Sequence, residues 1–385
     1  MKGASVQNFS EMLQTLVADS SFTERELQEL LGSTDSMHEL LSGLRAPTLY
    51  EATLLGAFFK VDPSVLMQGK SPSMGVSLRL GAVDGISGVG AVVEHATKLL
   101  SVDRITREWG FEEPVTDLPD FSPSRKWNYR QAGENTAVRL RAYLDLEDTE
   151  PVADLTGLVE SLGYPVEYRS LPNDVHGISV PEVWGQQTAW VILINCNDNW
   201  ARQRFTLAHE LSHVLQGDAG QVIVDRAVTE DRGPERIADS FARNFLLPEE
   251  ALESIFSAHR PIRSHGQLAD LVTDVMLTYG VSRDATVYAL RETGIGSIDP
   301  NLLDSCARAS VADMMRISGR QQQWLEMVEV AGRALASERL TKQTLDAYGD
   351  GLTSFEAVAD VIAGGNLDRA ETLLRDAGWE DLASA

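Results

Sequence analysis

The sequence has few cysteines and no long hydrophobic run, and each shortage excludes a class of protein. Its 385 residues include only two cysteines, Cys196 and Cys306, which are too few and too far apart for a disulfide scaffold or a CxxC metal site. No run of about 18 apolar residues occurs, so no membrane span is expected. The first residues also lack the apolar core of a signal peptide. These absences predict a soluble, cytoplasmic protein without a membrane partner.

Positive charge is scarce as well. Lys and Arg number 33 against 57 Asp and Glu, which gives a formal net charge of −24. Such a charge opposes bulk attraction to DNA, RNA or anionic lipid, so any nucleic-acid contact must be local. The hydrophobic content of 43% is ample for buried cores, and the length predicts two or three domains.

The chemistry that the sequence does carry is a His-Glu-x-x-His motif in the run RFTLAHELSHVLQGD. On a helix, His209 and His213 lie one turn apart and share a face, so both imidazoles can reach one ion. Glu210 points to one side and can reach a water at the site without binding the ion. The surrounding apolar residues would bury all three polar side chains, which is unfavourable without a metal or other partners. The motif therefore predicts a metal site.

A third ligand must come from elsewhere, because a catalytic zinc usually has three protein ligands. The run PERIADSF offers two carboxylates on one face of the next helix, Glu235 and Asp239. The pair resembles the Glu-x-x-x-Asp arrangement of gluzincin peptidases, which implies that Glu235 binds zinc and Asp239 orients a histidine ligand. The reverse assignment stays open at this point, since both carboxylates suit zinc.

The motif and its context together resemble one family. The run RQRFTLAHELSHVLQGD followed by PERIADSFARNFLLP is similar to the ImmA/IrrE family of zinc metallopeptidases, as are the apolar run AWVILIN before it and LADLVTDVMLTYGVSRDATVYALRETG after it. The resemblance covers about residues 134–295. It implies that His209, His213 and Glu235 hold Zn2+, with Mn2+ as an alternative ion in activity assays, and that Glu210 is the catalytic base.

Residues 9–67 are typical of several short helices. The order TERELQELLG, then SMHELLSGLRAPTLYEATLLGAFFKVDPSVL, resembles the helix-turn-helix domain of the Xre/Cro repressor family. In that family the helix around Ser36–Leu44 would enter the major groove. The resemblance therefore implies contacts with DNA or a partner protein from Ser36, Met37, His38 and Arg45.

Two features of this segment depart from the repressor pattern. Glu24 stands where the family usually has Gln, and residues 1–70 carry five basic against nine acidic side chains, a balance of 5 − 9 = −4. Phosphate neutralisation usually supplies most of the affinity for DNA, and this segment has little to offer for it. Docking to a protein, or a homodimer through this region, therefore stands beside direct DNA binding.

The whole chain predicts a mostly helical α+β fold in four parts. Residues 1–70 form the helix-turn-helix domain and 71–133 a Ser/Gly-rich linker with a connecting helix. Residues 134–297 form a zincin-like metallopeptidase domain with a small sheet and the HExxH helix, and 298–385 form a helical region without a chemical motif. Strands are expected at PVEYRSL and AWVILINCN, the second a candidate edge for pairing with an extended substrate.

Other polar residues carry weaker predictions. Three of them are candidates for stabilising an oxyanion, although a structural role suits each at least as well: His176, Tyr164 and Arg204. His95 and His265 stand in polar helical contexts, which predicts solvated side chains. Cys196 follows an apolar strand and is expected to be packed.

The ImmA/IrrE resemblance implies an anti-repressor, an endopeptidase that cleaves an Xre-type repressor encoded nearby. Its action would derepress stress-response or mobile-element genes. Two alternatives are a DNA-binding transcriptional regulator with a sensory peptidase-like domain and the toxin of a two-gene toxin–antitoxin pair. The acidic helix-turn-helix segment favours a protein partner in each.

Overall fold

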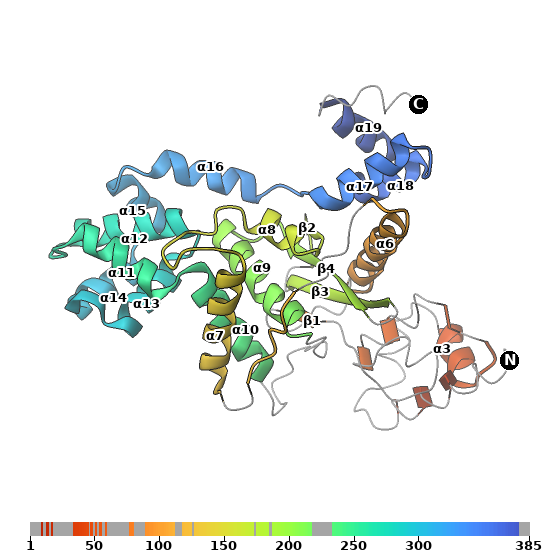
Figure 1. Cartoon of the computed structure of the whole chain (residues 1–385), viewed down its shortest axis with the longest axis horizontal. Helices are drawn as coiled ribbons and strands as arrows, with labels where there is room; N and C mark the ends of the chain where they lie inside the picture. The colour runs from red at the N-terminus through yellow and green to blue at the C-terminus, as the bar shows by residue number, and fades with distance from the viewer. Residues whose placement is uncertain are drawn as a thin grey trace.

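The computed structural model describes most of the chain after residue 88. The described runs are 34–45, 77–80, 89–111, 118–124, 127–172, 175–184, 187–217 and 233–376, with single positions between residues 9 and 59. Helices dominate, and one sheet lies among them (Figure 1). None of the described helices is long and apolar enough to cross a membrane.

The elements follow one another in this order along the chain. The first half contains α3 (Thr34–Leu41), β1 (Ser77–Leu80), α6 (Val89–Glu108), α7 (Tyr129–Tyr143), α8 (Leu155–Ser161), β2 (Val166–Arg169), β3 (Val175–Trp184), β4 (Gln187–Asn195) and α9 (Trp200–Leu215). The second half contains α10 (Gly233–Leu246), α11 (Glu249–His259), α12 (His265–Tyr279), α13 (Arg283–Thr293), the 3-10 turn η1 (Ile295–Ser297), α14 (Pro300–Arg308), α15 (Val311–Ile317), α16 (Gln321–Ala331), α17 (Glu338–Gly349), α18 (Phe355–Ala363) and α19 (Leu367–Asp376).

The sheet has the strand order β1-β3-β4-β2. The two predicted strands are present as β2 and β4, and β4 lies inside the sheet. It pairs antiparallel with β3 and, over residues 192–195, parallel with β2. Both edges of residues 192–194 are therefore taken by neighbouring strands, which corrects for these residues the expectation that 189–195 receive an extended substrate. Residues 189–191 pair with β3 on one edge.

The expected linker is not wholly irregular. Its residues Ser77–Leu80 form β1, which pairs antiparallel with β3 from Ser77↔Ser179 to Leu80↔Val175. The strand has only four residues, so the alternation of apolar and polar side chains is too brief to indicate a strand within a Ser/Gly-rich stretch. The connecting helix predicted after it is present as α6.

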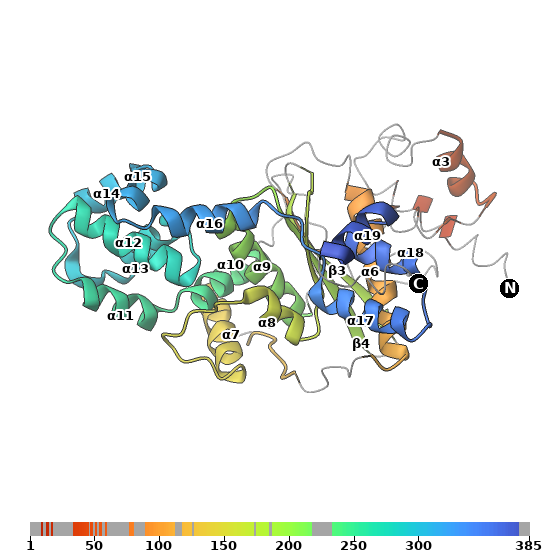
Figure 2. The same ribbon diagram turned by 90° about the horizontal axis from the view of Figure 1, so that it is seen from above.

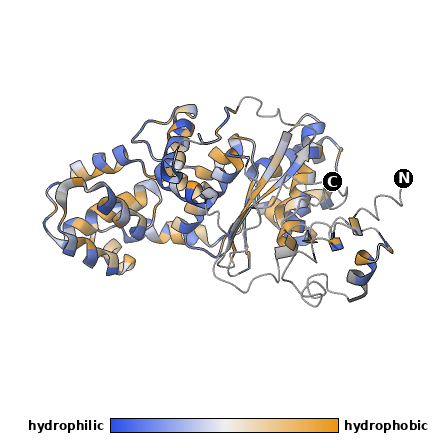
Figure 3. Cartoon of the chain, turned by 90° about the horizontal axis from the view of Figure 1, so that it is seen from below, coloured by the Kyte–Doolittle hydropathy of each residue, from blue (hydrophilic) through white to orange (hydrophobic). Residues whose placement is uncertain are grey.

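Alternate residues of β4 face two different cores, as the period of two in a strand requires. One set packs with α9 and the helices beyond it: Trp190, Ile192 and Ile194. The other set packs with α6 and the C-terminal helices: Ala189, Val191 and Leu193. In Figure 3 hydrophobic residues accordingly lie on both sides of the sheet. Coverage of both faces explains why this strand is apolar almost throughout.

Helices α17 and α18 of the C-terminal region, to which the sequence assigned no role, cover the second face of the sheet, while α14 and α15 pack into the core on the other face. Leu340 of α17 and Val361 of α18 are buried with Val93 and Leu99 of α6 against β3 and β4. Figure 2 shows α6, α17 and α18 on one side of the strands and α9 and α10 on the other. The region is thus part of the same folded unit as the sheet.

Charged side chains are buried where α6, α8 and α17 meet. We call Asp103, Arg107, Glu160 and Arg339 the joint cluster. The Asp103 carboxylate lies 3.0 Å from Arg107 and 3.3 Å from Arg339. Glu160 accepts backbone N–H bonds from Arg339 at 3.0 Å and Val166 at 3.1 Å. Burial raises the pKa of Glu160, because it disfavours the charged carboxylate. The N–H bonds oppose this rise by stabilising the carboxylate.

His95 is not solvated, contrary to the prediction. Its Nε2 lies 2.7 Å from Oε2 of Glu167 on β2, and both side chains are almost buried, at 13% and 11% exposure. The polar context of His95 within its own helix carried no information about a partner 72 residues away. His265, by contrast, is exposed as predicted.

Candidate metal centre

Helix α9 is fixed at both ends and buried along its length. The Asn199 side chain caps it by accepting a hydrogen bond from the N–H of Arg202 at 3.0 Å, and Gly217 follows its last turn with a positive φ of 60°. Apolar residues of the helix pack into the large core, among them Leu207 and Leu211. This packing holds the motif side chains inside the protein.

Helix α10 is held close to α7 by a glycine. A Cβ on Gly133 would lie 2.4 Å from the carbonyl oxygen of Ile237 and 2.6 Å from the N of Phe241. The Ser240 hydroxyl adds a bond of 2.8 Å to the carbonyl of Arg130. This close approach fixes α10 beside α9, and with it the two carboxylates at its N-terminal end.

The structure brings together the three predicted metal ligands, His209, His213 and Glu235, which we call the metal cluster. Their ligand atoms all lie within 4.8 Å of one another. The two Nε2 atoms are 3.2 Å apart, and the Glu235 carboxylate lies 3.2 Å from that of His209 and 3.3 Å from that of His213. Two imidazoles and one carboxylate that converge on one point are a donor set typical of zinc.

Asp239 contacts the other side of the same histidine. Its Oδ1 lies 3.1 Å from Nδ1 of His209. A hydrogen bond from Nδ1–H to this carboxylate would leave the lone pair of Nε2 directed at the metal cluster. Glu235 thus occupies the position that a ligand needs, and Asp239 that of an orienting partner.

The electrostatics of Glu235 suit a ligand. Burial alone would raise the pKa of this carboxyl, but the hydrogen bonds with His209 and His213 outweigh burial and hold the pKa well below its usual range. The carboxylate is therefore ionised at neutral pH, as a metal ligand must be.

Glu210 is buried beside the metal cluster but is not one of its members. Its Oε2 accepts a hydrogen bond of 2.8 Å from the Ser179 hydroxyl on β3, while its buried Oε1 has no hydrogen-bond partner among the described residues. Burial raises the pKa of this carboxyl, and the neighbouring histidines oppose the rise. A raised pKa suits a group that must accept a proton near neutral pH.

Strand β3 makes room for Glu210 with small residues. A Cβ on Gly177 would lie 2.4 Å from Cγ2 of Thr206 and 3.4 Å from Cγ of Glu210. Ser179, two residues on, faces the same helix. Sequence reasoning missed both residues, although the Gly-x-Ser alternation in a strand was a usable signal of close packing.

The three oxyanion candidates are all engaged elsewhere. His176 contacts Asp198 through Nδ1 at 2.8 Å, and Arg204 donates to the backbone carbonyls of Val152 and Ala153. Tyr164 is part of the large core, and burial raises its pKa to about 12. These contacts favour the structural reading of each. Cys196 and Cys306 are buried thiols.

The predicted DNA- or partner-binding residues lie on and after α3. Ser36 and Met37 belong to the helix, His38 is exposed, and Arg45 forms ion pairs with Glu39 and Glu51. Arg45 is therefore already neutralised by its own chain. The run TERELQELLG, the first half of the helix-turn-helix resemblance, lies outside the described residues.

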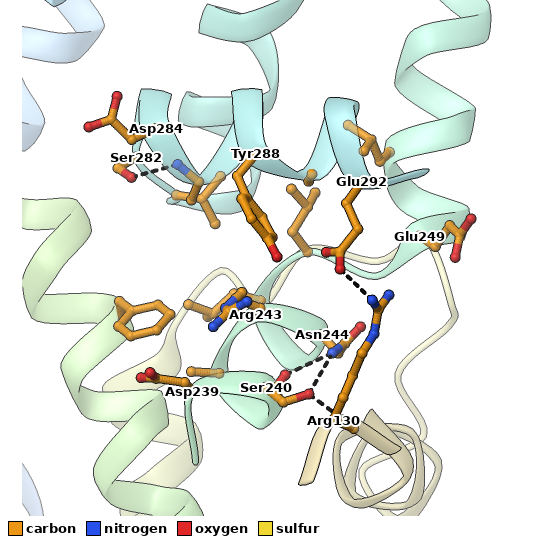
Figure 4. A pocket seen from close by; sticks show the side chains of 18 of the residues that line it. Arg130, Asp239, Ser240, Arg243, Asn244, Glu249, Ser282, Asp284, Tyr288 and Glu292 are labelled. Carbon is orange, nitrogen blue, oxygen red and sulfur yellow. Dashed lines mark hydrogen bonds and ion pairs between the residues drawn. The ribbon is translucent and has the colours of Figure 1, made fainter. Parts of the chain in front are cut away.

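A pocket of about 1000 Å³ opens beside the metal cluster, between α9, α10 and α13 (Figure 4). Asp239 and Phe205 line it, and the Phe205 ring lies 6.3 Å from the ring of His209. The pocket thus begins on the side of His209 that Asp239 supports. No pattern in the sequence indicates this pocket, because its walls come from helices far apart in the chain.

A known protein family matches the part of the chain that contains α9 and α10. A family model described as the IrrE N-terminal-like domain, Peptidase_M78, matches residues 160–291. This span includes β2 through α13 and all five motif residues on α9 and α10, and it confirms the predicted resemblance for this part of the chain. The match does not reach residues 1–70, for which the sequence predicted a helix-turn-helix domain. Neither the curated proteins nor the solved structures include a significant match to the chain.

Proposed function

We propose that the chain is a zinc-dependent endopeptidase that acts as an anti-repressor, cleaving a helix-turn-helix repressor of the Xre type. The observation that carries the proposal is the convergence of His209, His213 and Glu235 beside a buried glutamate that binds none of their atoms. The peptidase family match over the same residues supports it. The repressor as substrate rests on the sequence resemblance alone.

In this proposal His209, His213 and Glu235 hold the zinc, and Asp239 fixes the orientation of the His209 ring. Zinc held there would supply Lewis acidity, lowering the pKa of a water and polarising the scissile carbonyl. Ser179 holds one oxygen of Glu210 in place. The other oxygen is left to take the proton from the attacking water and to pass it to the leaving amine.

The test is Glu210→Gln in the full-length protein with zinc and candidate repressors encoded beside its gene. An amide cannot accept the proton, so cleavage should fall by about 10²–10⁴-fold. Zinc content should stay at the wild-type value because Glu210 is not a ligand. Glu326→Gln on exposed α16 makes the same chemical change far from the site and should cleave normally.

The same variant distinguishes the peptidase function from that of a transcription factor. A transcription factor with a peptidase-like sensor should regulate its genes equally well with Glu210→Gln, since no bond is broken. Unchanged target-gene output at equal protein level would therefore refute the peptidase function. Silent target genes with an intact repressor would support it.

A further inference from the structure

Four arginines line the pocket beside the metal cluster, and three of them have no carboxylate partner among the described residues. Arg202 contacts His176 at 3.1 Å, and the other two are Arg236 and Arg243. The Arg243 guanidinium lies 5.4 Å from the ring centre of Tyr288, and that of Arg236 lies 5.9 Å from the ring centre of Tyr129. An aromatic face orients a guanidinium but leaves its N–H groups free to donate to a ligand.

The carboxylates of the pocket do not neutralise these two arginines. Four line it, and three have partners of their own: Asp239 with His209, Glu292 with Arg130, and Asp284 with Arg283. The fourth, Glu249, lies at the start of α11, on the opposite side of the pocket from Asp239 (Figure 4). None of the four forms an ion pair with Arg236 or Arg243, so both guanidiniums keep N–H donors for a ligand. Figure 4 labels Arg243 between Asp239 and Tyr288.

Arg243 lies in line with the metal cluster along α10. Glu235, Asp239 and Arg243 are spaced four residues apart and so share one face of the helix. A rise of 1.5 Å per residue puts Arg243 about 12 Å from Glu235 along the axis. An extended peptide advances about 3.3–3.6 Å per residue. A side chain held by Arg243 would thus belong to a residue about two to four positions from the cleaved bond.

We propose that this pocket binds an acidic side chain of the substrate, with Arg243 and Arg236 donating to its Asp or Glu carboxylate. The proposal rests on the peptidase function proposed above and names a determinant of its specificity. A guanidinium matches a carboxylate with two parallel N–H donors, which a neutral amide cannot replace at full strength.

Direct binding tests the pocket without requiring cleavage. The probes are fluorescent 12-residue peptide pools of mixed sequence in which one position is fixed as Glu, Gln or Lys, bound to zinc-loaded full-length Glu210→Gln. The Glu pool should bind about tenfold more tightly than the Gln pool when the fixed position reaches the pocket. Adding Arg243→Glu should abolish this preference and favour the Lys pool. Arg369→Glu on exposed α19 makes the same charge change and should leave the preference as it was.

The outcomes separate this proposal from the peptidase function. Equal binding of the three pools, or a Glu preference that survives Arg243→Glu, overturns the acidic pocket even if the wild-type protein cleaves the peptides. Glu-selective binding that depends on Arg243, without cleavage by the wild-type protein, supports the pocket and refutes the peptidase function instead. Zinc content and circular dichroism establish that each variant is folded, and Arg243→Gln provides a milder change that should reduce the preference.

Discussion

The metal cluster and the joint cluster are both groups of buried ionisable side chains, but they are assembled in opposite ways. In the metal cluster, three groups that can each bind a metal converge: two imidazole nitrogens 3.2 Å apart and a carboxylate within 3.3 Å of both. In the joint cluster, donors alternate with acceptors, as Asp103 lies between Arg107 and Arg339. Converging ligand groups suit an added cation, whereas Asp103 already faces two cations of its own chain.

The comparison predicts first that the metal cluster loses its ion when either histidine is removed. His209→Ala or His213→Ala leaves two protein ligands of three, so bound zinc should fall from about one equivalent to almost none. Elemental analysis of the purified protein measures this, with His265→Ala as the control because that histidine is exposed. Full zinc content in the double variant would show that the cluster is not a metal site.

The second prediction concerns stability without metal loss. Asp103→Ala removes a buried acceptor that pairs with Arg339, 6% exposed, and Arg107, 18% exposed, and breaking a buried pair in this way should lower the free energy of unfolding by about 3–5 kcal/mol. Urea unfolding measures the loss, and zinc bound per folded chain should not change. Asp313→Ala removes a pair in which both side chains are more than 60% exposed, so its effect should stay below about 1 kcal/mol. Zinc loss in Asp103→Ala would contradict the separation of the two clusters.

The two clusters also differ in how far the sequence could predict them. His209, Glu210, His213, Glu235 and Asp239 stand at helical spacings within two short runs, so local periodicity was enough to place them on common faces. In the joint cluster only Asp103 and Arg107 stand at a helical spacing, whereas the contacts of Arg339 with Asp103 and Glu160 join segments 236 and 179 residues apart. Neither pattern nor composition encodes such a pairing. Ser179 was missed for the same reason, since its contact with Glu210 depends on how β3 packs against α9.

Fold prediction had the same limit. The apolar run of β4 predicted a strand covered on both faces, but not that α6 and α17 would cover it, because coverage depends on packing between distant segments. The sequence could not predict β1, because this strand lies in a Ser/Gly-rich stretch and its four residues are too few to establish an alternating pattern. The helix-turn-helix assignment of residues 1–70 still rests on resemblance.

The third prediction ranks the two carboxylates of α10. Glu235→Ala should lose most of the bound zinc, because it removes a ligand. Asp239→Ala should only weaken zinc affinity by about 10–100-fold, because the His209 ring loses its orienting partner. Competition with a chelator of known affinity measures both. The reverse ranking would make Asp239 the ligand and Glu235 its support, the alternative that the sequence left open.

The smallest expected effect lies in the N-terminal segment. There Arg45 and Glu51 form an ion pair in which, as in the joint cluster, a guanidinium faces a carboxylate. The hydrogen bonds from Arg45 lower the pKa of Glu51 from 4.5 to about 2, although burial opposes them. A pKa lowered on folding stabilises the fold above the unfolded value of 4.5, and this stability is lost as the pH falls towards 2. Arg45→Ala should therefore destabilise the segment by about 1 kcal/mol at neutral pH, since its side chain is about a third exposed and water screens the pair. Hydrogen exchange of residues 34–59 in the full-length protein should show faster opening of the variant at neutral pH, and the difference should shrink below pH 4.5.

DNA binding should be weak and should depend as little on salt in the variant as in the wild type, because Arg45 is already neutralised by Glu39 and Glu51. A variant with unchanged exchange but a clearly reduced salt dependence would instead show that Arg45 contacts phosphate, and the segment would then be a DNA-binding domain.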